Sequence, residues 1–317
     1  MIIPEKKLFG RKIKIFWYNN SGEKIMIEYL DVKKFVEQWK KEIAQKVASC
    51  SRTPSLTIIQ IGHDAASDLY VHNKLKDCKE VGIYTDSYEI PIDAGIETHD
   101  LCQLVTNVET DAVIVQLPVP KEIDMAQVID FIPPEKDVDG FTKDSPFVPA
   151  TAAGIMKYLD ALPSYDKNNT NPMKDGAGRS ALVIGRSKIV GIPVAKELLS
   201  RNYTVTVAHS KTSEADLMAK KMEADLVVVA VGHPHAIDIG CCSDGCVIID
   251  VGTNYVLGQD GRRHLMGDTY WDHKWDKLHR QDIIYSTPVP GGVGLLTRCA
   301  LLQNVVDAYH LQNKGDN

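Results

Sequence analysis

No stretch of the sequence is long and apolar enough to cross a membrane as a helix, so a transmembrane protein is not expected. Basic residues are not in excess, because the chain has 36 Lys and Arg but 42 Asp and Glu, which gives a formal charge of -6. This balance argues against a general affinity for nucleic acids or anionic membranes, although it allows a local basic pocket. Residues 1–20 lack the apolar core of a secretion signal. We therefore expect a cytoplasmic protein.

The cysteines lack the spacing of a zinc site. Seven are scattered along the chain, and Cys241, Cys242 and Cys246 gather in the segment CCSDGC. No second cysteine pair or histidine pair follows at the spacing of a zinc finger, so this cluster would supply an incomplete set of ligands. We expect no metal there, and free thiols in a loop that leads into a strand.

The chain does have the alternating pattern of an α/β protein. Its length of 317 residues corresponds to about two domains of ordinary size. Residues 30–49 carry apolar side chains at helical spacing, whereas residues 55–62 and 111–120 contain short apolar runs rich in β-branched residues. Helices that alternate with apolar strands indicate βαβ units and a mostly parallel sheet.

A second α/β series follows a polar segment. Residues 161–180 are rich in Asn, Asp, Gly, Ser and Pro and are the best candidate for a linker. After them come apolar strands in SALVIG, YTVTVAHS, EADLVVVAVG and GCVIIDVG, and each ends in glycine or a small polar residue. Open α/β sheets bind ligands at the carboxyl ends of their strands, so we expect a ligand site at these ends.

The segment VIGRSKIVGIP has the context of a dinucleotide-binding turn. Gly185 ends a predicted strand, Gly191 lies six residues later, and Pro193 lies near the start of a predicted helix. The middle glycine of the common G-x-G-x-x-G fingerprint is replaced by Ser187. Backbone amides at the start of the helix would still face a pyrophosphate.

The residues around this turn favour NADP over NAD. Arg186 follows the first glycine, and His209 and Ser210 end the next predicted strand, with Lys211 beside them. An NAD site usually has an acidic residue near there that accepts hydrogen bonds from the ribose, and none stands at that spot. A guanidinium and a hydroxyl suit a 2′-phosphate. If no nucleotide binds, Arg186 is an ordinary loop residue.

Three further motifs carry little information by themselves. In TPVPGGVG, prolines beside Gly291 and Gly292 indicate a stiff turn whose backbone a ligand could approach. The segment EKDVDGF, which contains Asp139, is typical of a charged surface turn. Tyr70 and Lys74 lie four residues apart in LYVHNKLK, which places them on one face of a predicted helix. Such a pair is typical of a solvated face.

Together, these motifs resemble those of one family. YVHNK, VQLPVP, KDVDGF, GRSKIVGIP, HSKT, ADLVVVAVGHP, IIDVGTN and TPVPGGVG occur in the order seen in bifunctional methylenetetrahydrofolate dehydrogenase/methenyltetrahydrofolate cyclohydrolase. The resemblance extends from about residue 55 to about residue 310. Each motif is weak alone, but the combination is highly specific.

The resemblance implies two α/β domains that face each other across a cleft, the second a Rossmann-type dinucleotide-binding domain. Residues 1–160 with 296–317 would form a folate-binding catalytic domain, and residues 161–295 an NADP-binding domain. The resemblance also implies a homodimer.

The resemblance further implies roles for individual residues. Lys74 would be the catalytic lysine, with Tyr70 one helical turn before it, and Gln116 would position Lys74 and the reacting water. Asp139 would bind the pterin, because one carboxylate can accept both an amino group and a ring N–H. The other substrate contacts would come from Pro288, Gly291 and Gly292. The NADP site would be formed by Gly185, Arg186, Ser187, Gly191, Pro193, His209, Ser210, Gly232, Pro234 and Thr253.

We therefore predict oxidation of 5,10-methylenetetrahydrofolate with NADP and hydrolysis of the methenyl product to 10-formyltetrahydrofolate. Three alternatives stay open: a dehydrogenase without hydrolysis, an unrelated amino-acid or shikimate-type dehydrogenase on the same fold, and a non-catalytic nucleotide-binding protein. Lys74 and Gln116 argue against the first, and VQLPVP and KDVDGF against the second. The retained reacting groups argue against the third.

The sequence departs from the family pattern at several positions. The segment PATAAG keeps only part of the usual motif, and the connection over residues 141–149 is shorter. Thr253 replaces an aliphatic residue and Leu295 a proline. None of these changes removes a reacting group, but the shortened connection lies beside Asp139 and bears on folate affinity.

Overall fold

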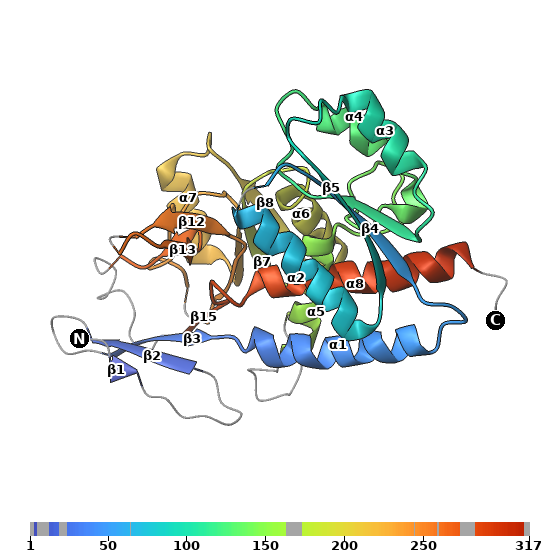
Figure 1. The fold of residues 1–317 in the computed structure, drawn as a ribbon. Coiled ribbons are helices and arrows are strands. Elements are labelled where there is room, and N and C mark those ends of the chain that lie inside the picture. Colours follow the sequence, from blue (N-terminus) through green and yellow to red (C-terminus); the bar gives the residue numbers. More distant parts are fainter. Residues whose placement is uncertain are drawn as a thin grey trace. The chain divides into compact units, whose positions relative to one another are not determined.

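The computed structural model of the chain describes residues 3–4, 13–18, 24–63, 65–162, 173–243, 245–258, 260–272 and 283–313. These residues form an α/β protein, as predicted (Figure 1). They divide into two compact units: unit 1 comprises residues 1–35 and 154–296, and unit 2 comprises residues 36–153 and 297–317. In the part of the chain that is described, no helix combines the length and the hydropathy needed to cross a membrane.

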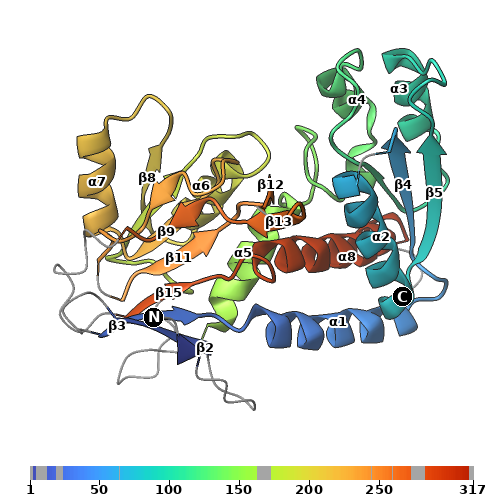
Figure 2. The ribbon, with the colours of Figure 1, turned by 60° about the vertical axis from the view of Figure 1, so that its left-hand side comes forward.

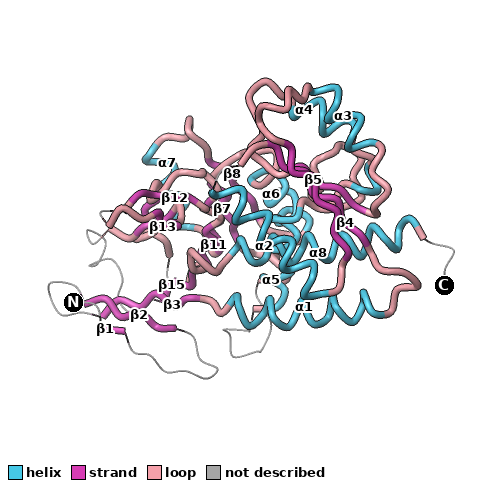
Figure 3. The backbone as a smooth tube through the Cα atoms, viewed as in Figure 1, coloured by secondary structure: helices cyan, strands magenta, loops and turns pink. Residues whose placement is uncertain are grey.

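Unit 2 contains a three-stranded parallel sheet in the order β5-β4-β6. Its strands are β4 (Ser55–Ile61), β5 (Tyr84–Ile90) and β6 (Ala112–Val115), and Figure 3 shows β4 and β5 side by side. Leu56, Ile58 and Ile59 have no exposed surface, so both faces of β4 are covered. A continuous apolar run is typical of such a strand, because helices pack on both faces of a parallel sheet.

Two helices of unit 2 connect these strands: α2 (Ala65–Val81) connects β4 to β5, and α3 (Thr98–Thr106) connects β5 to β6. Helix α4 (Met125–Phe131) and the 3₁₀ helix η1 (Pro134–Lys136) follow β6. Leu101 of α3 and Val128 of α4 are buried in one apolar cluster with Ile59 and Val113. Three further helices, α1 (Val32–Ala48), α5 (Ala150–Ala161) and α8 (Val293–Gln312), contribute residues to both units.

Unit 1 is built around an eight-stranded sheet in the order β1-β2-β3-β15-β11-β9-β7-β8 (Figure 2). The strands from β3 to β8 in this order run parallel, and β2 and β1 extend the sheet in antiparallel fashion. Their bounds are β1 (Ile3–Pro4), β2 (Ile13–Tyr18), β3 (Lys24–Tyr29), β7 (Ser180–Ile184), β8 (Thr204–Ala208), β9 (Leu226–Val229), β11 (Val247–Asp250) and β15 (Ile283–Ser286).

Helices and short strands complete unit 1. Helix α6 (Gly191–Ser200) connects β7 to β8, and α7 (Glu214–Glu223) connects β8 to β9. Two small pairs lie outside the main sheet: β10 (Ile237–Asp238) with β14 (Thr269–Tyr270), and β12 (Asn254–Leu257) with β13 (Arg263–Met266). The helices and parallel strands give the alternation that the sequence predicts for a dinucleotide-binding sheet.

The compact units and the predicted domains, residues 1–160 with 296–317 and residues 161–295, place the first residues of the chain differently. Residues 1–35 belong to unit 1, because β3 pairs with β15, for example Ile27 with Ile284. The boundary between residues 296 and 297, inside α8, lies within one residue of the predicted one. The boundary between residues 153 and 154 falls inside α5, before the polar segment 161–180, of which residues 163–172 lie outside the described part. A helix interior carries no turn signal, so composition gives no mark of the boundary in α5.

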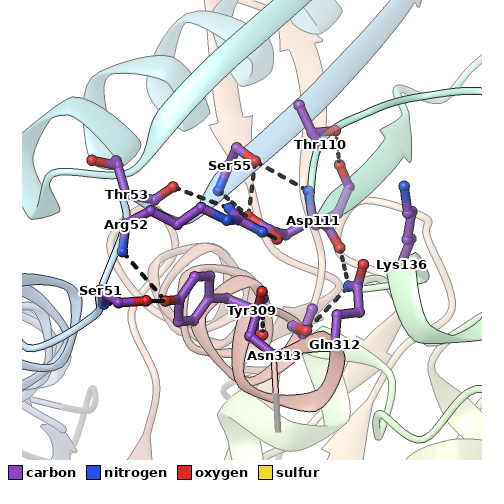
Figure 4. Close-up of polar contacts among 12 residues, drawn as sticks. Ser51, Arg52, Thr53, Ser55, Thr110, Asp111, Lys136, Tyr309, Gln312 and Asn313 are labelled. Atoms are coloured by element: carbon purple, nitrogen blue, oxygen red, sulfur yellow. Dashed lines mark hydrogen bonds and ion pairs between the residues drawn. The ribbon is translucent and has the colours of Figure 1, made fainter. Parts of the chain in front are cut away.

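Polar side chains fasten the amino ends of β4 and β6 to the end of α8 (Figure 4). Asp111, just before β6, is 2% exposed, and Arg52 donates two hydrogen bonds to its carboxylate, at 2.8 and 2.5 Å. Ser55 donates to the same carboxylate through its backbone N–H and its hydroxyl, each at 2.8 Å. In α8, Gln312 donates to the Asp111 carbonyl at 2.7 Å, and the Arg52 guanidinium lies 4.9 Å from the Tyr309 ring centroid.

We predict that Asp111→Ala lowers the free energy of unfolding by about 2–4 kcal/mol, because Arg52 and both donors of Ser55 lose their acceptor. Urea unfolding followed by circular dichroism measures this loss. Glu109→Ala removes an exposed carboxylate two residues away and is the matched control. Equal losses in the two variants would contradict the assignment.

The Asp111 carboxylate also makes the free energy of unfolding depend on pH. Burial alone would raise the pKa of Asp111, but hydrogen bonds from Arg52 and Ser55 outweigh burial and lower the pKa. The stabilisation is therefore complete above the unfolded-state pKa of about 3.9 and is lost as the pH falls through the folded-state pKa. The difference in stability between wild type and Asp111→Ala should shrink in acid.

Candidate active site

A hydrogen bond joins Lys74 and Gln116 in unit 2. Lys74 lies within α2, and Gln116 directly follows β6. The Lys74 ammonium donates to Gln116 Oε1 at 3.1 Å, and Gln116 Nε2 donates to the Leu117 carbonyl at 2.6 Å. The backbone N–H of Gln116 donates to the Ile59 carbonyl at 2.8 Å and so continues the sheet. Gln116 is therefore held at both its backbone and its side chain, and it positions the lysine amine.

Asp139 lies close enough to Lys74 for the two charges to interact. The loop that carries it is built around Asp137, which is 1% exposed and accepts hydrogen bonds from two backbone N–H groups of the loop, at 3.0 and 2.6 Å. From α8, Asn304 donates to the Val138 carbonyl at 2.8 Å. The segment that resembles a surface turn in sequence is thus anchored in the interior of unit 2.

Burial governs the protonation of Lys74 and Asp139. It lowers the pKa of Lys74, an effect that Asp139 and Cys78 oppose and Arg298 reinforces. Burial likewise raises the pKa of Asp139, although the charge of Lys74 opposes this rise. Both shifts have one cause, because removal from water disfavours the charged form of any group. An amine whose pKa is lowered, beside a carboxyl whose pKa is raised, is suited to proton transfer.

The other residues predicted for this site lie on α2 and after β15. Tyr70 is half-buried one turn before Lys74 on α2, and within the described chain it makes no hydrogen bond to Lys74. Pro288, Gly291 and Gly292 follow β15 and belong to unit 1. A Cβ on Gly292 would lie 2.3 Å from the Pro288 carbonyl oxygen, so the predicted tight turn requires glycine there.

The carboxyl ends of four parallel strands in unit 1 carry the predicted cofactor residues. Gly185 follows β7, His209 follows β8, Gly232 follows β9, and Thr253 follows β11. Parallel strands end at the same edge of a sheet, so all four loops leave from one edge. Strands β8 and β9, which follow β7 along the chain, lie on opposite sides of β7 in the sheet. Open α/β sheets bind ligands at such a switch point.

Two glycines shape the turn between β7 and α6. A Cβ on Gly185 would lie 2.2 Å from the Ala230 carbonyl oxygen, and one on Gly191 would lie 2.2 Å from the Gly185 carbonyl oxygen. Only glycine permits these approaches, so the ends of β7 and β9 and the start of α6 pack closely. Pro193 is buried in the first turn of α6, where a missing N–H costs no helical hydrogen bond.

Ser187 accepts hydrogen bonds from the start of α6. Its hydroxyl accepts hydrogen bonds at 3.2 Å from the N–H groups of residues 190 and 191, and its carbonyl accepts one at 3.0 Å from Ile192. The first amides of α6 are therefore satisfied within the protein, which differs from the expectation that they face a ligand. Residues 186–189 are exposed, and their N–H groups make no hydrogen bond within the described chain. With Arg186 beside them, they can receive an anion.

The loop after β8 has the chemistry of a phosphate site. His209 Nδ1 accepts a hydrogen bond from the Lys211 N–H at 3.2 Å, and Thr212 Oγ1 accepts one from the His209 N–H at 2.9 Å. Ser210 and Lys211 are exposed, and no acidic side chain lies in this loop. A hydroxyl and an ammonium group here fit the predicted 2′-phosphate.

Two buried aspartates that are not among the predicted site residues hold the loops after β9 and β11. Asp268 accepts hydrogen bonds from two backbone N–H groups of the β9 loop, including that of Gly232, at 2.7 and 2.9 Å, and from the Asn254 side chain at 2.8 Å. Asp250 accepts from the N–H groups of Gly252 at 2.9 Å and Asp268 at 3.0 Å. The sequence carries a signal for Asp250, because this acidic residue ends the apolar run VIID. No local pattern pointed to Asp268.

Comparison with known families identifies the family of this chain. Residues 30–139 match the catalytic domain of tetrahydrofolate dehydrogenase/cyclohydrolase, and residues 149–313 match the NAD(P)-binding domain of the same family. The chain belongs to this family. The resemblance predicted from the motifs is thereby confirmed, and the carboxyl edge of the unit 1 sheet lies in the NADP-binding domain.

Known proteins resemble this chain over most of its length. The chain is 38% identical over 297 residues to bifunctional protein FolD of Moorella thermoacetica, covering 89% of this chain and 98% of that protein. FolD of Campylobacter jejuni has a similar structure, with a TM-score of 0.77, 31% identity and coverage of 90% and 99%. The Trypanosoma brucei enzyme, solved with NADP and an inhibitor, also has a TM-score of 0.77, with 30% identity and coverage of 90% and 97%.

We predict that Asp268→Asn weakens NADP binding about tenfold. An amide offers one acceptor oxygen where the carboxylate offers two, so at least one buried donor of the β9 or β11 loop loses its partner. Calorimetric titration with NADP measures the dissociation constant. Asp260→Asn changes an exposed carboxylate nearby and should leave the constant unaltered. The same dissociation constant in Asp268→Asn and wild type would contradict the assignment.

Proposed function

We propose that this chain is a bifunctional enzyme of one-carbon metabolism. It oxidises 5,10-methylenetetrahydrofolate to the 5,10-methenyl form with NADP and hydrolyses that product to 10-formyltetrahydrofolate. The observation that carries the proposal is the 3.1 Å hydrogen bond between Lys74 and Gln116 beside Asp139, in a chain that matches both domains of the family. A dehydrogenase alone would not need this lysine–glutamine pair.

The dehydrogenase step depends on alignment more than on proton transfer. NADP supplies the acceptor for the hydride that leaves the one-carbon bridge of the substrate. The chain holds the two ligands in a fixed relative geometry, which lowers the entropic part of the barrier. Asp139 holds the pterin, whose amino group and adjacent ring N–H both donate to the carboxylate. These two donors favour the charged carboxylate and oppose the burial that raises the pKa of Asp139.

The hydrolytic step requires a proton acceptor. Water adds to the methenyl carbon and releases one proton, which leaves a hydroxyl on that carbon. The hydroxyl then loses its proton as the C=O bond forms, and the bond from this carbon to one of its two nitrogens breaks as that nitrogen takes up a proton, so that a formyl group remains on the other. Lys74 accepts the proton, because burial lowers the pKa of its amine and populates the neutral form. Gln116 holds the amine and the reacting water in place.

We assign supporting roles to the other predicted residues. Tyr70 packs against the folate, and the turn of Pro288, Gly291 and Gly292 presents its backbone to the substrate. Arg186 and Ser210 bind the 2′-phosphate, which favours NADP over NAD. The loops at the cofactor edge are shaped by Gly185, Ser187, Gly191, Pro193, His209, Gly232, Pro234 and Thr253. The homodimer and the cytoplasmic location stay predictions.

Turnover of 5,10-methylenetetrahydrofolate tests this function directly. We expect reduced cofactor to form faster with NADP than with NAD, without lasting accumulation of the methenyl compound, because hydrolysis removes it. Absorbance of the reduced cofactor and of the methenyl compound are followed together. Accumulating methenyl product would indicate a dehydrogenase alone. No reduction of either nucleotide would contradict the folate function.

We predict that Lys74→Met lowers the rate of methenyl hydrolysis by about 100-fold or more, because the group that accepts the proton is lost. Supplying 5,10-methenyltetrahydrofolate as substrate isolates this step, and circular dichroism tests the folding of the variant. Lys76→Met, two residues further along α2 and exposed, is the control. Hydrolysis at the wild-type rate in Lys74→Met would rule out the assigned role.

A further inference from the structure

Three charged side chains from three helices meet in unit 2, close to Lys74. Asp77 of α2 has a side chain that is 5% exposed, and Lys40 of α1 donates to its Oδ1 at 2.6 Å. Arg298 of α8 lies with Nη1 3.0 Å from Asp77 Oδ2, and its side chain is 17% exposed. Figures 1 and 2 both show α1, α2 and α8 side by side in this unit. The cluster therefore ties together the helices around the catalytic lysine.

The cluster contains more positive than negative charge in its buried part. Burial would lower the pKa of Lys40, but Asp77 and Glu80 outweigh it and raise the pKa, so Lys40 stays charged. Glu80 is 53% exposed, and water screens its charge. Asp77 is thus the one buried carboxylate that both Lys40 and Arg298 contact. Its Oδ2 accepts no hydrogen bond among the described residues, so charge alone holds Arg298 there.

The charge of Arg298, on α8, lowers the pKa of Lys74, whereas the other neighbours of Lys74 do not lower it through charge. Asp139, in the loop after η1, favours the charged ammonium. Cys78, one turn further along α2, also favours the charged ammonium when it is ionised, but burial raises its pKa to about 12, which limits this effect to high pH. Gln116, after β6, is neutral at all pH values. Among these groups, Arg298 is the one that opposes protonation of the amine through its own charge.

We propose that Arg298 is a positioning residue of the hydrolytic step. Anchored through Asp77 to Lys40, its guanidinium places a fixed positive charge beside the Lys74 amine and favours the neutral form that accepts the proton from water. Arginine suits this task because it stays charged over the whole working range of pH. Asp77 lies three residues after Lys74 on α2, so the anchor and the amine move as one rigid element. This inference rests on the proposed cyclohydrolase function.

The pH profile of methenyl hydrolysis tests the proposal. In Arg298→Met the repulsion is lost, Lys74 holds its proton more tightly, and the acidic limb of the profile moves to higher pH. At a pH below the wild-type midpoint we expect the rate to fall about threefold to tenfold. Arg298→Lys retains the charge and should restore most of the wild-type profile. The probe is 5,10-methenyltetrahydrofolate, with uncatalysed hydrolysis subtracted.

Arg52→Met is the matched control. It also removes an arginine that contacts a buried carboxylate of unit 2, and it should reduce stability in urea without moving the pH profile. Asp77 keeps Lys40 as a partner in Arg298→Met, so we expect that variant to fold. Superimposable profiles for wild type and Arg298→Met, or an equal shift in Arg52→Met, would overturn the inference and leave Arg298 a structural residue. Absence of hydrolysis in the wild type would overturn the proposed function as well.

Discussion

The parallel direction of neighbouring strands is the constraint on which both sites depend. In unit 2, β4 and β6 start at one edge, where Arg52 meets Asp111, and end at the other, where Gln116 leaves β6 and bonds to Ile59. The β4–β6 ladder therefore separates the Arg52–Asp111 cluster from the proposed catalytic pair of Lys74 and Gln116. In unit 1 the same rule brings the loops after β7, β8, β9 and β11 to a single edge. Residues far apart in sequence can act on one cofactor only because these strands run in the same direction.

Two charged groups of unit 2 differ in the hydrogen bonds that offset their removal from water. Asp111 receives four hydrogen bonds from Arg52 and Ser55, and its pKa falls despite burial. Among the described residues, Lys74 makes one hydrogen bond, to the neutral amide of Gln116, and burial lowers its pKa. Asp111 contributes to stability, because its charged form is the favoured one. A disfavoured charged form, as on Lys74, is typical of groups that transfer protons, which supports the proposed role of this residue.

The cofactor edge is held in shape by the protein before a ligand arrives. Ser187 satisfies the first amides of α6, and Asp250 and Asp268 join the loops after β9 and β11. Ordering these loops in advance reduces the entropic cost of binding. The amides of residues 186–189 are exposed, in keeping with the proposed phosphate contacts.

The sequence by itself determined the α/β class, the strands that precede each loop, the family and the residues assigned to reaction and binding. These features follow from local periodicity, turn glycines and short motifs, which depend on neighbours along the chain. Only the tertiary structure decided that β3 joins the sheet of unit 1, that Ser187 occupies the start of α6, and that Arg298 meets Asp77. It also decided the lowered pKa of Lys74. The reason is physical: burial and charge pairing arise between segments that are distant in sequence, and no local pattern records them.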